Sequence, residues 1–339
     1  MTMVVANEQL KKLFQAFRNR NDAAFYQAAE ALIAEELAAN HHSLASDLKK
    51  ALGSYRELAK SSGNSFTLLP KDKRSGEELI TLHESSVDAT KIILCQETKA
   101  KIERVLEEHR KRKLLARYGY KPKTKLLFWG SPGCGKTFTA NYLAYELGLP
   151  VGVLQLSAVI SSFVGDTASH LQRVFNLANN TPMVLLLDEV DAVGKNRDDP
   201  NDVGELKRVV NSLLQAMDTF QSTESVIIAA SNHQYLLDPA LWRRFDDIIH
   251  FPLPDKTERE LYLKTLLNGV NFDGSVAYLS KNMSSFSYAE IKTVTIEGVK
   301  TMILEGRESL KSSDILEQVK AYKKGTSAAK SKLEVVINE

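Results

Sequence analysis

The chain has 339 residues, of which 43% are hydrophobic and 25% are charged, so it has enough apolar side chains for more than one globular core. Its 44 Lys and Arg residues nearly balance 42 Asp and Glu residues, and the net charge of +2 excludes a polycation that binds nucleic acid or acidic lipid over its whole surface. The two cysteines, Cys95 and Cys134, are too few for a disulfide framework or a four-cysteine zinc site. No secretory leader is recognisable, and no apolar run approaches the roughly 18 residues that span a bilayer. We therefore expect a cytoplasmic protein that does not contact membranes.

An amphipathic helical pattern runs through residues 1–60. Further helices are expected over residues 23–39 and about 44–58, and three short helices can share one small core. We therefore expect an N-terminal helical domain over residues 1–60, which would select a substrate or dock a partner. The first helix carries apolar residues at positions i, i+3, i+4 and i+7, namely Leu10, Leu13, Phe14 and Phe17.

A linker is expected over residues 61–85, where a Ser-rich and Gly-containing stretch is followed by a charged one. The next helix is expected over about residues 97–118, and it carries the basic run Arg110-Lys111-Arg112-Lys113. Such a run usually lies on a solvated helix face, and a nucleic-acid contact would need further basic and aromatic side chains beside it.

Short apolar runs follow, and they are apolar almost throughout rather than alternating. They lie at residues 126–129, 151–156, 183–187, 226–230 and 248–251. Strands of this kind are buried on both faces, which is typical of a parallel sheet covered by helices on both sides. From residue 256 to about 324 the pattern is helical again. The predicted fold class is therefore α/β, with additional helical regions before and after the sheet.

A phosphate-binding motif follows the first apolar run. It has the spacing G-x-x-x-x-G-K-[ST] and consists of Gly130-Ser131-Pro132-Gly133-Cys134-Gly135-Lys136-Thr137. Its glycines let backbone N–H groups converge on phosphate oxygens, and the helix that follows adds the positive end of its dipole. Lys136 is expected to reach the β- and γ-phosphates, and the Thr137 hydroxyl to bind Mg²⁺. Between a strand and a helix, this motif predicts a P-loop NTPase.

Two carboxylates, Asp188 and Glu189, end the third apolar run. At the carboxyl edge of a parallel sheet they would lie beside the phosphate loop. Asp188 is suited to hold Mg²⁺ through water, and Glu189 is suited to orient and deprotonate an attacking water. The two motifs together predict nucleotide hydrolysis.

These motifs resemble those of the AAA+ ATPases. Later segments are similar to the subgroup of hexameric unfoldases, membrane-bound AAA proteases and microtubule severers. The stretch Ile227-Ile228-Ala229-Ala230-Ser231-Asn232 resembles the sensor-1 strand. The resemblance implies that the nucleotide is ATP with Mg²⁺ and that Asn232 hydrogen-bonds the γ-phosphate or the attacking water.

Two adjacent arginines lie in a segment that resembles the family's arginine fingers, which act on the nucleotide of a neighbouring subunit. The subgroup usually has Arg-Pro-Gly-Arg-Phe-Asp, whereas here Arg243 and Arg244 directly precede Phe245-Asp246. Arg244 matches the second finger best. Arg243 either takes the other role or pairs with an acid, and both could instead be plain surface residues.

The family's central-pore loop follows the second strand, and the matching stretch here contains Phe163-Val164-Gly165. The resemblance implies that Phe163 wedges against an extended polypeptide while Gly165 lets the loop move. The alternative is a core phenylalanine at a helix start. Residues 197–202 lie where a second pore loop would be, or form a solvated connection.

The lid of the family is also recognisable, because Ser287-Tyr288-Ala289-Glu290-Ile291 resembles a helix start within it, and Ala289 fits a subgroup without a sensor-2 arginine. The resemblance implies a large ATPase domain over residues 86–253, a small helical lid over residues 254–328 and a tail over residues 329–339.

The leading hypothesis is a homo-oligomer, most simply a hexameric ring, that hydrolyses ATP and threads a polypeptide substrate through its pore. A separately encoded protease or other effector is a candidate partner, because His83-Glu84 lacks the following x-x-His of a zinc protease. Two alternatives stay open. One is a nucleic-acid-linked AAA+ motor or defence ATPase, and the other is an ATP-switched scaffold with little turnover.

Overall fold

The computed structural model describes residues 28–29, 31–33, 48, 79–85, 92–156, 167–193, 202–233 and 238–337, with the side chains of 192–193, 202–207 and 326–337 left aside. The chain forms two compact units, Met1–Leu69 and Pro70–Glu339. In the first unit the described residues are helical, and Ala28, Ala29 and Ile33 are buried. The remainder of the expected N-terminal helices lies outside the described residues.

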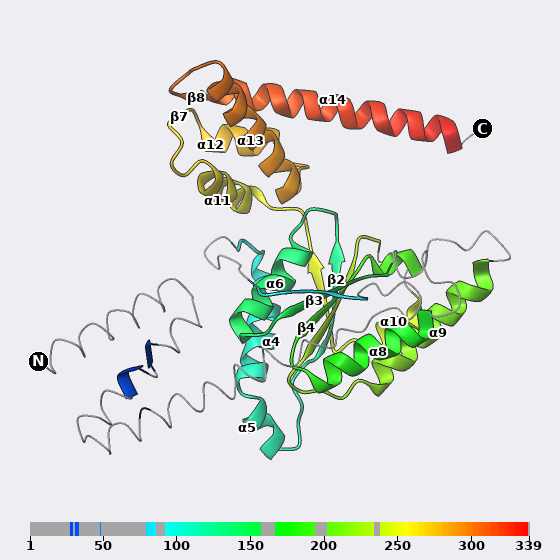
Figure 1. The fold of residues 1–339 in the computed structure, drawn as a ribbon. Coiled ribbons are helices and arrows are strands. Elements are labelled where there is room, and N and C mark those ends of the chain that lie inside the picture. The colour runs from blue at the N-terminus through cyan, green and yellow to red at the C-terminus, as the bar shows by residue number, and fades with distance from the viewer. Residues whose placement is uncertain are drawn as a thin grey trace, which may run out of the picture. The chain divides into compact units, whose positions relative to one another are not determined.

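A six-stranded sheet forms the centre of the second unit (Figure 1). Its order is β1-β3-β4-β5-β2-β6, in which β1 runs antiparallel to β3 and every other pair is parallel. The expected parallel sheet is thereby confirmed. The strands are β1 (Thr81–His83), β2 (Lys125–Gly130), β3 (Val151–Gln155), β4 (Val184–Asp188), β5 (Val226–Ser231) and β6 (Asp247–Phe251).

Strand β1 lies in the stretch expected to be linker, so that expectation is wrong for residues 81–83. Among the described residues the strand pairs with β3 alone, at the edge of the sheet, and Leu82 is the one side chain of its three that is partly buried. A strand this short and this exposed has no hydrophobic pattern from which it could be predicted.

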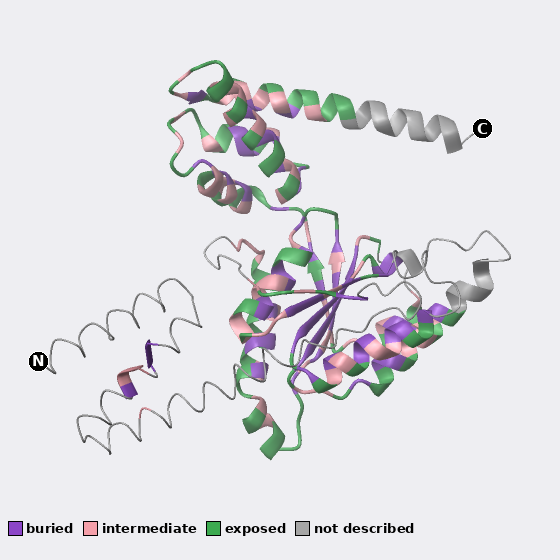
Figure 2. Ribbon diagram, viewed as in Figure 1, coloured by how far each residue is buried: buried purple, intermediate pink, exposed green. Residues whose placement is uncertain are grey.

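Helices cover both faces of the sheet, as Figure 1 shows. Helices α4 (Gln96–Arg110) and α6 (Lys136–Leu147) pack on one face, and α8 (Thr167–Asn180) and α9 (Asp202–Thr219) pack together on the other. The strands between them are buried along most of their length (Figure 2). The core on the α4 and α6 side includes Ile102, Leu143 and Phe128, whose ring lies 4.9 Å from that of Phe251.

The helix expected over residues 97–118 is divided in two. Helix α4 ends at Arg110, Lys111 has a non-helical backbone, and α5 (Arg112–Arg117) follows with no buried residue. Helix α5 buries no side chain in the core, so no packing interaction requires it to continue α4 in the same direction.

The lid forms a second core after Pro254. Its helices are α11 (Lys256–Leu266), α12 (Val276–Asn282), α13 (Tyr288–Leu304) and α14 (Ser312–Ile337), and a two-residue parallel pair joins β7 (Phe272–Asp273) to β8 (Leu310–Lys311). Helices α11 and α13 each begin with a capping box. Helix α14 continues through residues 329–337, so the expected tail is helical as far as Ile337. Among the described helices, none has the length and apolar character needed to cross a membrane.

Candidate functional site

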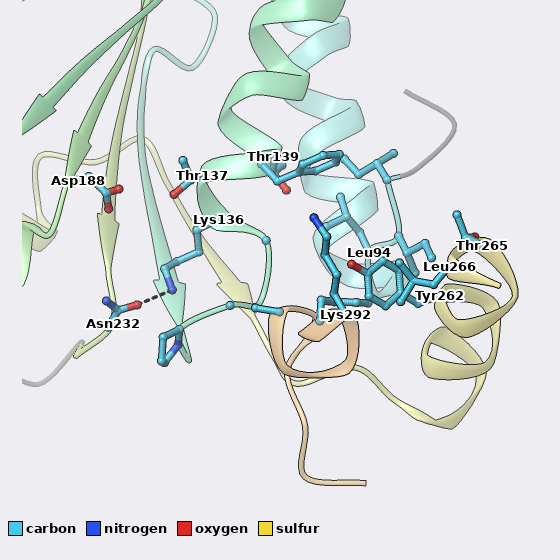
Figure 3. Close-up of a pocket in the computed structure, with 18 of the residues that line it drawn as sticks. Leu94, Lys136, Thr137, Thr139, Asp188, Asn232, Tyr262, Thr265, Leu266 and Lys292 are labelled. Atoms are coloured by element: carbon cyan, nitrogen blue, oxygen red, sulfur yellow. Dashed lines mark hydrogen bonds between the residues drawn. The ribbon is translucent and has the colours of Figure 1, made fainter. Parts of the chain in front are cut away.

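A cavity of about 700 Å³ opens at the carboxyl edge of the sheet (Figure 3). Strands β4, β5 and β2 are neighbours in the sheet, so their carboxyl ends bring together three motifs that are far apart in sequence. Asp188, Glu189 and Asn232 therefore line one cavity together with five residues of the phosphate loop, Pro132, Gly133, Gly135, Lys136 and Thr137. The opposite wall comes from the lid and from the segment before α4. It consists of Ile92, Ile93, Leu94, Tyr262, Thr265, Leu266, Tyr288, Ala289 and Lys292.

The phosphate loop is shaped by packing as well as by its need to hold phosphate. A Cβ on Gly130 would lie 2.1 Å from the carbonyl oxygen of Phe251, so the approach of β6 requires glycine there. Gly135 precedes α6 with a left-handed φ of 96°, and residues 136–139 of that helix line the cavity. The unpaired N–H groups of a helix's first turn form an anion-binding site.

The Lys136 ammonium is buried at the centre of this site. It donates hydrogen bonds to the carbonyl oxygens of Gly130 (2.7 Å) and Ser131 (3.0 Å) and to Oδ1 of Asn232 (2.8 Å; Figure 3). Burial lowers the pKa of Lys136, although the carboxylates of Asp188 and Asp191 oppose that shift. All three ammonium protons are thus donated to neutral oxygens. An anionic phosphate oxygen would be a stronger acceptor than any of these three.

Burial also raises the pKa of the Cys134 thiol within the phosphate loop. A protonated thiol is a poor nucleophile, so this cysteine is suited to packing in the loop rather than to chemistry.

The two carboxylates at the end of β4 have different geometry. Asp188 is half-buried, and its Oδ1 accepts a hydrogen bond from the backbone N–H of Glu189 at 2.9 Å. Among the described residues other than glycine, only Glu189 has a positive φ, at 56°. That conformation costs about 1–3 kcal/mol and is typically retained where function needs it. Here it accompanies an exposed carboxylate that lines the cavity.

Asp191 is a site residue that the sequence motifs did not single out. It is 1% exposed, and its Oδ1 accepts hydrogen bonds from the Ser231 hydroxyl (3.4 Å) and from the Asn232 backbone N–H (3.3 Å). The turn η3 (Val190–Val193) is thereby tied to the end of β5. Asp191 therefore positions Asn232, which in turn contacts Lys136. The available signal was a third acid two residues after Glu189.

Thr137 and Asp188 offer oxygen donors of the kind that Mg²⁺ prefers. Within the described part of the chain, no group of three or more His, Cys, Asp or Glu side chains could hold a metal by itself. A magnesium ion at Thr137 and Asp188 would therefore need water and nucleotide phosphate oxygens to complete its coordination, which is its usual mode of binding.

The two arginines expected as fingers lie outside the cavity, after the short helix α10 (Pro239–Trp242). The Arg244 guanidinium donates to both carboxylate oxygens of Asp218, each at 2.8 Å, and to the carbonyl oxygen of Ala240 at 2.8 Å. The bidentate bond raises the pKa of Arg244 and lowers that of Asp218. Arg243 is exposed, and it makes no hydrogen bond or ion pair within the part of the chain that the structure describes.

The expected pore loop, Phe163-Val164-Gly165, lies outside the described residues, and so do residues 197–201.

The lid touches the phosphate loop directly at the start of α13. The backbone N–H of Ala289 donates to the carbonyl oxygen of Gly133 at 3.1 Å. Gly133 has a φ of 75°, and a Cβ there would lie 2.7 Å from Ala289 Cβ and 2.8 Å from Ser287 Oγ. The glycine at this position is therefore needed for contact with the lid.

An aromatic pair covers the lid side of the cavity. The rings of Tyr262 and Tyr288 meet edge to face at 5.1 Å, and the Tyr288 hydroxyl donates to Glu258 at 3.4 Å. Burial raises the pKa of Tyr288, so its hydroxyl stays a donor at neutral pH. Sequence reasoning missed both tyrosines, because an aromatic residue at helical spacing is most often a core residue.

Gly133→Ala should separate the lid from the phosphate loop. The added methyl group overpacks this contact, for which we expect a loss of stability of about 1–3 kcal/mol, measured by denaturant unfolding, and weaker ADP binding. Adding Ala289→Gly should recover part of both losses, because it removes the atom in closest contact. Unchanged ADP affinity in Gly133→Ala would mean that lid docking does not contribute to binding.

The parallel sheet, the phosphate loop between β2 and α6, and the polar residues ending β4 and β5 define a P-loop nucleotide-binding protein. Residues 126–253 match the family described as "ATPase family associated with various cellular activities (AAA)". The chain is also 34% identical over 307 residues to the uncharacterized AAA family ATPase y4kL of Sinorhizobium fredii, covering 91% of this chain and 92% of that relative. The chain belongs to the AAA ATPase family, binds nucleotide and hydrolyses ATP.

Two further relatives carry more specific names. A proteasome-activating nucleotidase of Sulfurisphaera tokodaii is 34% identical over 226 residues, which are 64% of this chain and 58% of that protein. The ATP-dependent zinc metalloprotease FtsH of Mesoplasma florum is 35% identical over 200 residues, which are 57% of this chain and 31% of that protein. The AAA modules of such proteins are thus relatives of this chain, although it spans only part of their length.

Proposed function

We propose that this ATPase is a ring-forming protein remodeller that draws polypeptide through a central pore. The main support for a ring-shaped assembly is the composition of the cavity. No arginine is present among the described residues that line it. Charge on a phosphoryl group in transfer is commonly stabilised by an arginine, which a second protein chain can supply in trans. Arg243 is exposed outside its own cavity and is available for that role.

Five polar residues of the cavity have a task in this proposal. Lys136 would leave Asn232 to bind the β- and γ-phosphates. Thr137 and Asp188 would hold Mg²⁺, which would neutralise charge on the phosphates. Glu189 accepts a proton from the attacking water. Asn232, held by Asp191, orients that water or the γ-phosphate.

The polypeptide substrate is proposed from the relatives, which include a proteasome-activating nucleotidase and an ATP-dependent protease. We propose residues 1–60 as the element that selects substrate or docks a partner, residues 86–253 and 254–328 as the ATPase domain and its lid, and the cytoplasm as the place of action. A separately encoded protease is the partner that this function would most directly serve.

A nucleic-acid motor is the second candidate, and the surface around α5 bears on it. Most of the basic run is neutralised, because Arg110 pairs with Glu146, Lys111 with Glu107 and Arg112 with Glu224. Against that, the nearby rings of Tyr118 and Tyr120 are 74% and 69% exposed, and exposed aromatic rings can stack on single-stranded bases.

The deciding experiment measures ATPase activity with an unfolded model polypeptide, single-stranded DNA or duplex DNA added, and records the oligomer size in ATP. Stimulation by the unfolded polypeptide in a ring-sized assembly is expected. Stimulation by DNA alone would favour the motor, and negligible turnover by the assembled protein would favour an ATP-switched scaffold.

Phe163→Ala tests the threading step itself. We expect ATP turnover within about twofold of the parent protein, and unfolding of a tagged fluorescent protein slowed about tenfold or more, because an aromatic anchor is lost. Phe163→Tyr should keep most of the unfolding rate. Full unfolding activity in Phe163→Ala would exclude Phe163 as the substrate-gripping residue.

A further inference from the structure

A lysine of the lid lines the nucleotide cavity. Lys292 lies on α13, one turn after Tyr288, and residues 288, 289 and 292 line the cavity together. It is exposed, and within the described part of the chain it makes no hydrogen bond or ion pair. Figure 3 shows its side chain reaching from the lid helix into the cavity. Lys136 and Lys292 are the two cationic side chains in the described lining.

The start of α13 is held against the phosphate loop, which limits where Lys292 can be. Ala289 donates its N–H to Gly133 and packs against the position where a Cβ of Gly133 would lie. Lys292 is three residues further on, about 4.5 Å along the helix axis, and on the same face. Its long side chain is therefore anchored within reach of anything bound to the phosphate loop.

No ion pair joins Lys292 to a carboxylate within the described part of the chain. Leu94, Leu266 and the ring of Tyr262 are apolar neighbours in this part of the cavity, and the Tyr288 hydroxyl is already bonded to Glu258. A lysine without an ionic partner in a cavity that also contains a phosphate loop fits a negatively charged ligand.

We propose that Lys292 binds the polyphosphate of the nucleotide from the lid side. An ammonium group carries a compact charge and three donors, so it can bind phosphate oxygens without the planar geometry that a guanidinium requires. Because Lys292 belongs to the lid, nucleotide affinity depends on the position of the lid. Docking of α13 on Gly133 places the Lys292 ammonium near the phosphates, and movement of the lid takes it away from them. This inference depends on ATP binding alone and not on the remodelling function.

The test compares Lys292→Met with two matched variants of the full-length protein. Lys292→Arg keeps the charge, and Lys300→Met removes an exposed lysine from the same helix that pairs with Glu297 and lies outside the cavity lining. Affinity is measured for ADP and for a non-hydrolysable ATP analogue by calorimetry, and for adenosine by displacement of a fluorescent ADP. Thermal midpoints establish that the variants are folded.

We expect Lys292→Met to weaken ADP and ATP-analogue binding about tenfold and to leave adenosine binding within about twofold, because an ionic hydrogen bond to phosphate is lost. Lys292→Arg should restore most of the affinity, and Lys300→Met should match the parent protein. Unchanged ADP affinity in Lys292→Met would overturn the proposal, as would an equal loss for adenosine, which would indicate a contact with the base or ribose. Lys136→Ala serves as the control for the site, because retained ADP binding there would show that nucleotide binds elsewhere.

Discussion

Replacing Glu189 with glutamine should lower the ATP turnover of the assembled protein by about 10²–10⁴-fold, while ATP binding stays nearly unchanged. The amide keeps the size and one oxygen of the carboxylate, so it can still contact water, but it cannot accept the proton. Phosphate release measures turnover, and light scattering in ATP should show that the assembled state persists because the bound ATP is not consumed.

The matched control for this variant is Glu224→Gln, which changes an exposed glutamate that pairs with Arg112 and lies outside the cavity lining. It should leave turnover unchanged. Turnover at the parent rate in Glu189→Gln would remove Glu189 as the base, and Asp188 would then be the remaining carboxylate in the described lining.

The buried strands and the phosphate loop could be predicted because each is specified by a local pattern. A run such as 184–187 is apolar at every position, which fits a central strand of a sheet covered by helices on both faces. The order of the strands then brings Asp188 and Asn232 to the same edge as Lys136. Local motifs and the rules of parallel sheets together account for the centre of the site.

The lid wall could not be predicted in the same way. No motif in the sequence marks Tyr262, Tyr288 or Lys292, which lie in ordinary helical segments. They reach the cavity because α11 packs on α13 and because Ala289 contacts Gly133. Edge strand β1 escaped prediction for a related reason, since its three residues gain their structure only by pairing with β3.

A chain of hydrogen bonds links the three strands that end at the site. Asp191 holds the backbone of Asn232, the Asn232 side chain accepts from Lys136, and Lys136 donates to Gly130 and Ser131. In the proposed mechanism, a γ-phosphate that accepts from the Lys136 ammonium would free the Asn232 side chain to contact the attacking water. The contact between Lys136 and Asn232 therefore supports the proposal that both residues act on the same phosphate group.

The sequence position of Arg244, directly before Phe245-Asp246, favours Arg244 as the arginine finger. The structure favours Arg243, because Arg244 is already paired with Asp218. A bidentate bond and a third bond to Ala240 hold the Arg244 guanidinium on its own subunit, and each would have to be given up for action in trans. We therefore expect Arg243→Ala to lower turnover of the assembly about 10³–10⁵-fold with ATP binding intact. Arg244→Ala should cost less than about tenfold, because its partly exposed ion pair contributes little.

Two further variants separate these roles. If Arg244 only stabilises the fold next to α10, Asp218→Ala should have the same effect as Arg244→Ala. If Arg244 is instead a finger restrained by Asp218, Asp218→Ala should raise turnover. Action in trans is measured by mixing Arg243→Ala subunits with Lys136→Ala subunits, each inactive alone. In a mixed assembly the Lys136→Ala subunit supplies an intact Arg243 to a neighbour whose cavity can still bind ATP, so activity should return. If the mixture stays inactive while mixed assemblies form, Arg243 does not act across the interface.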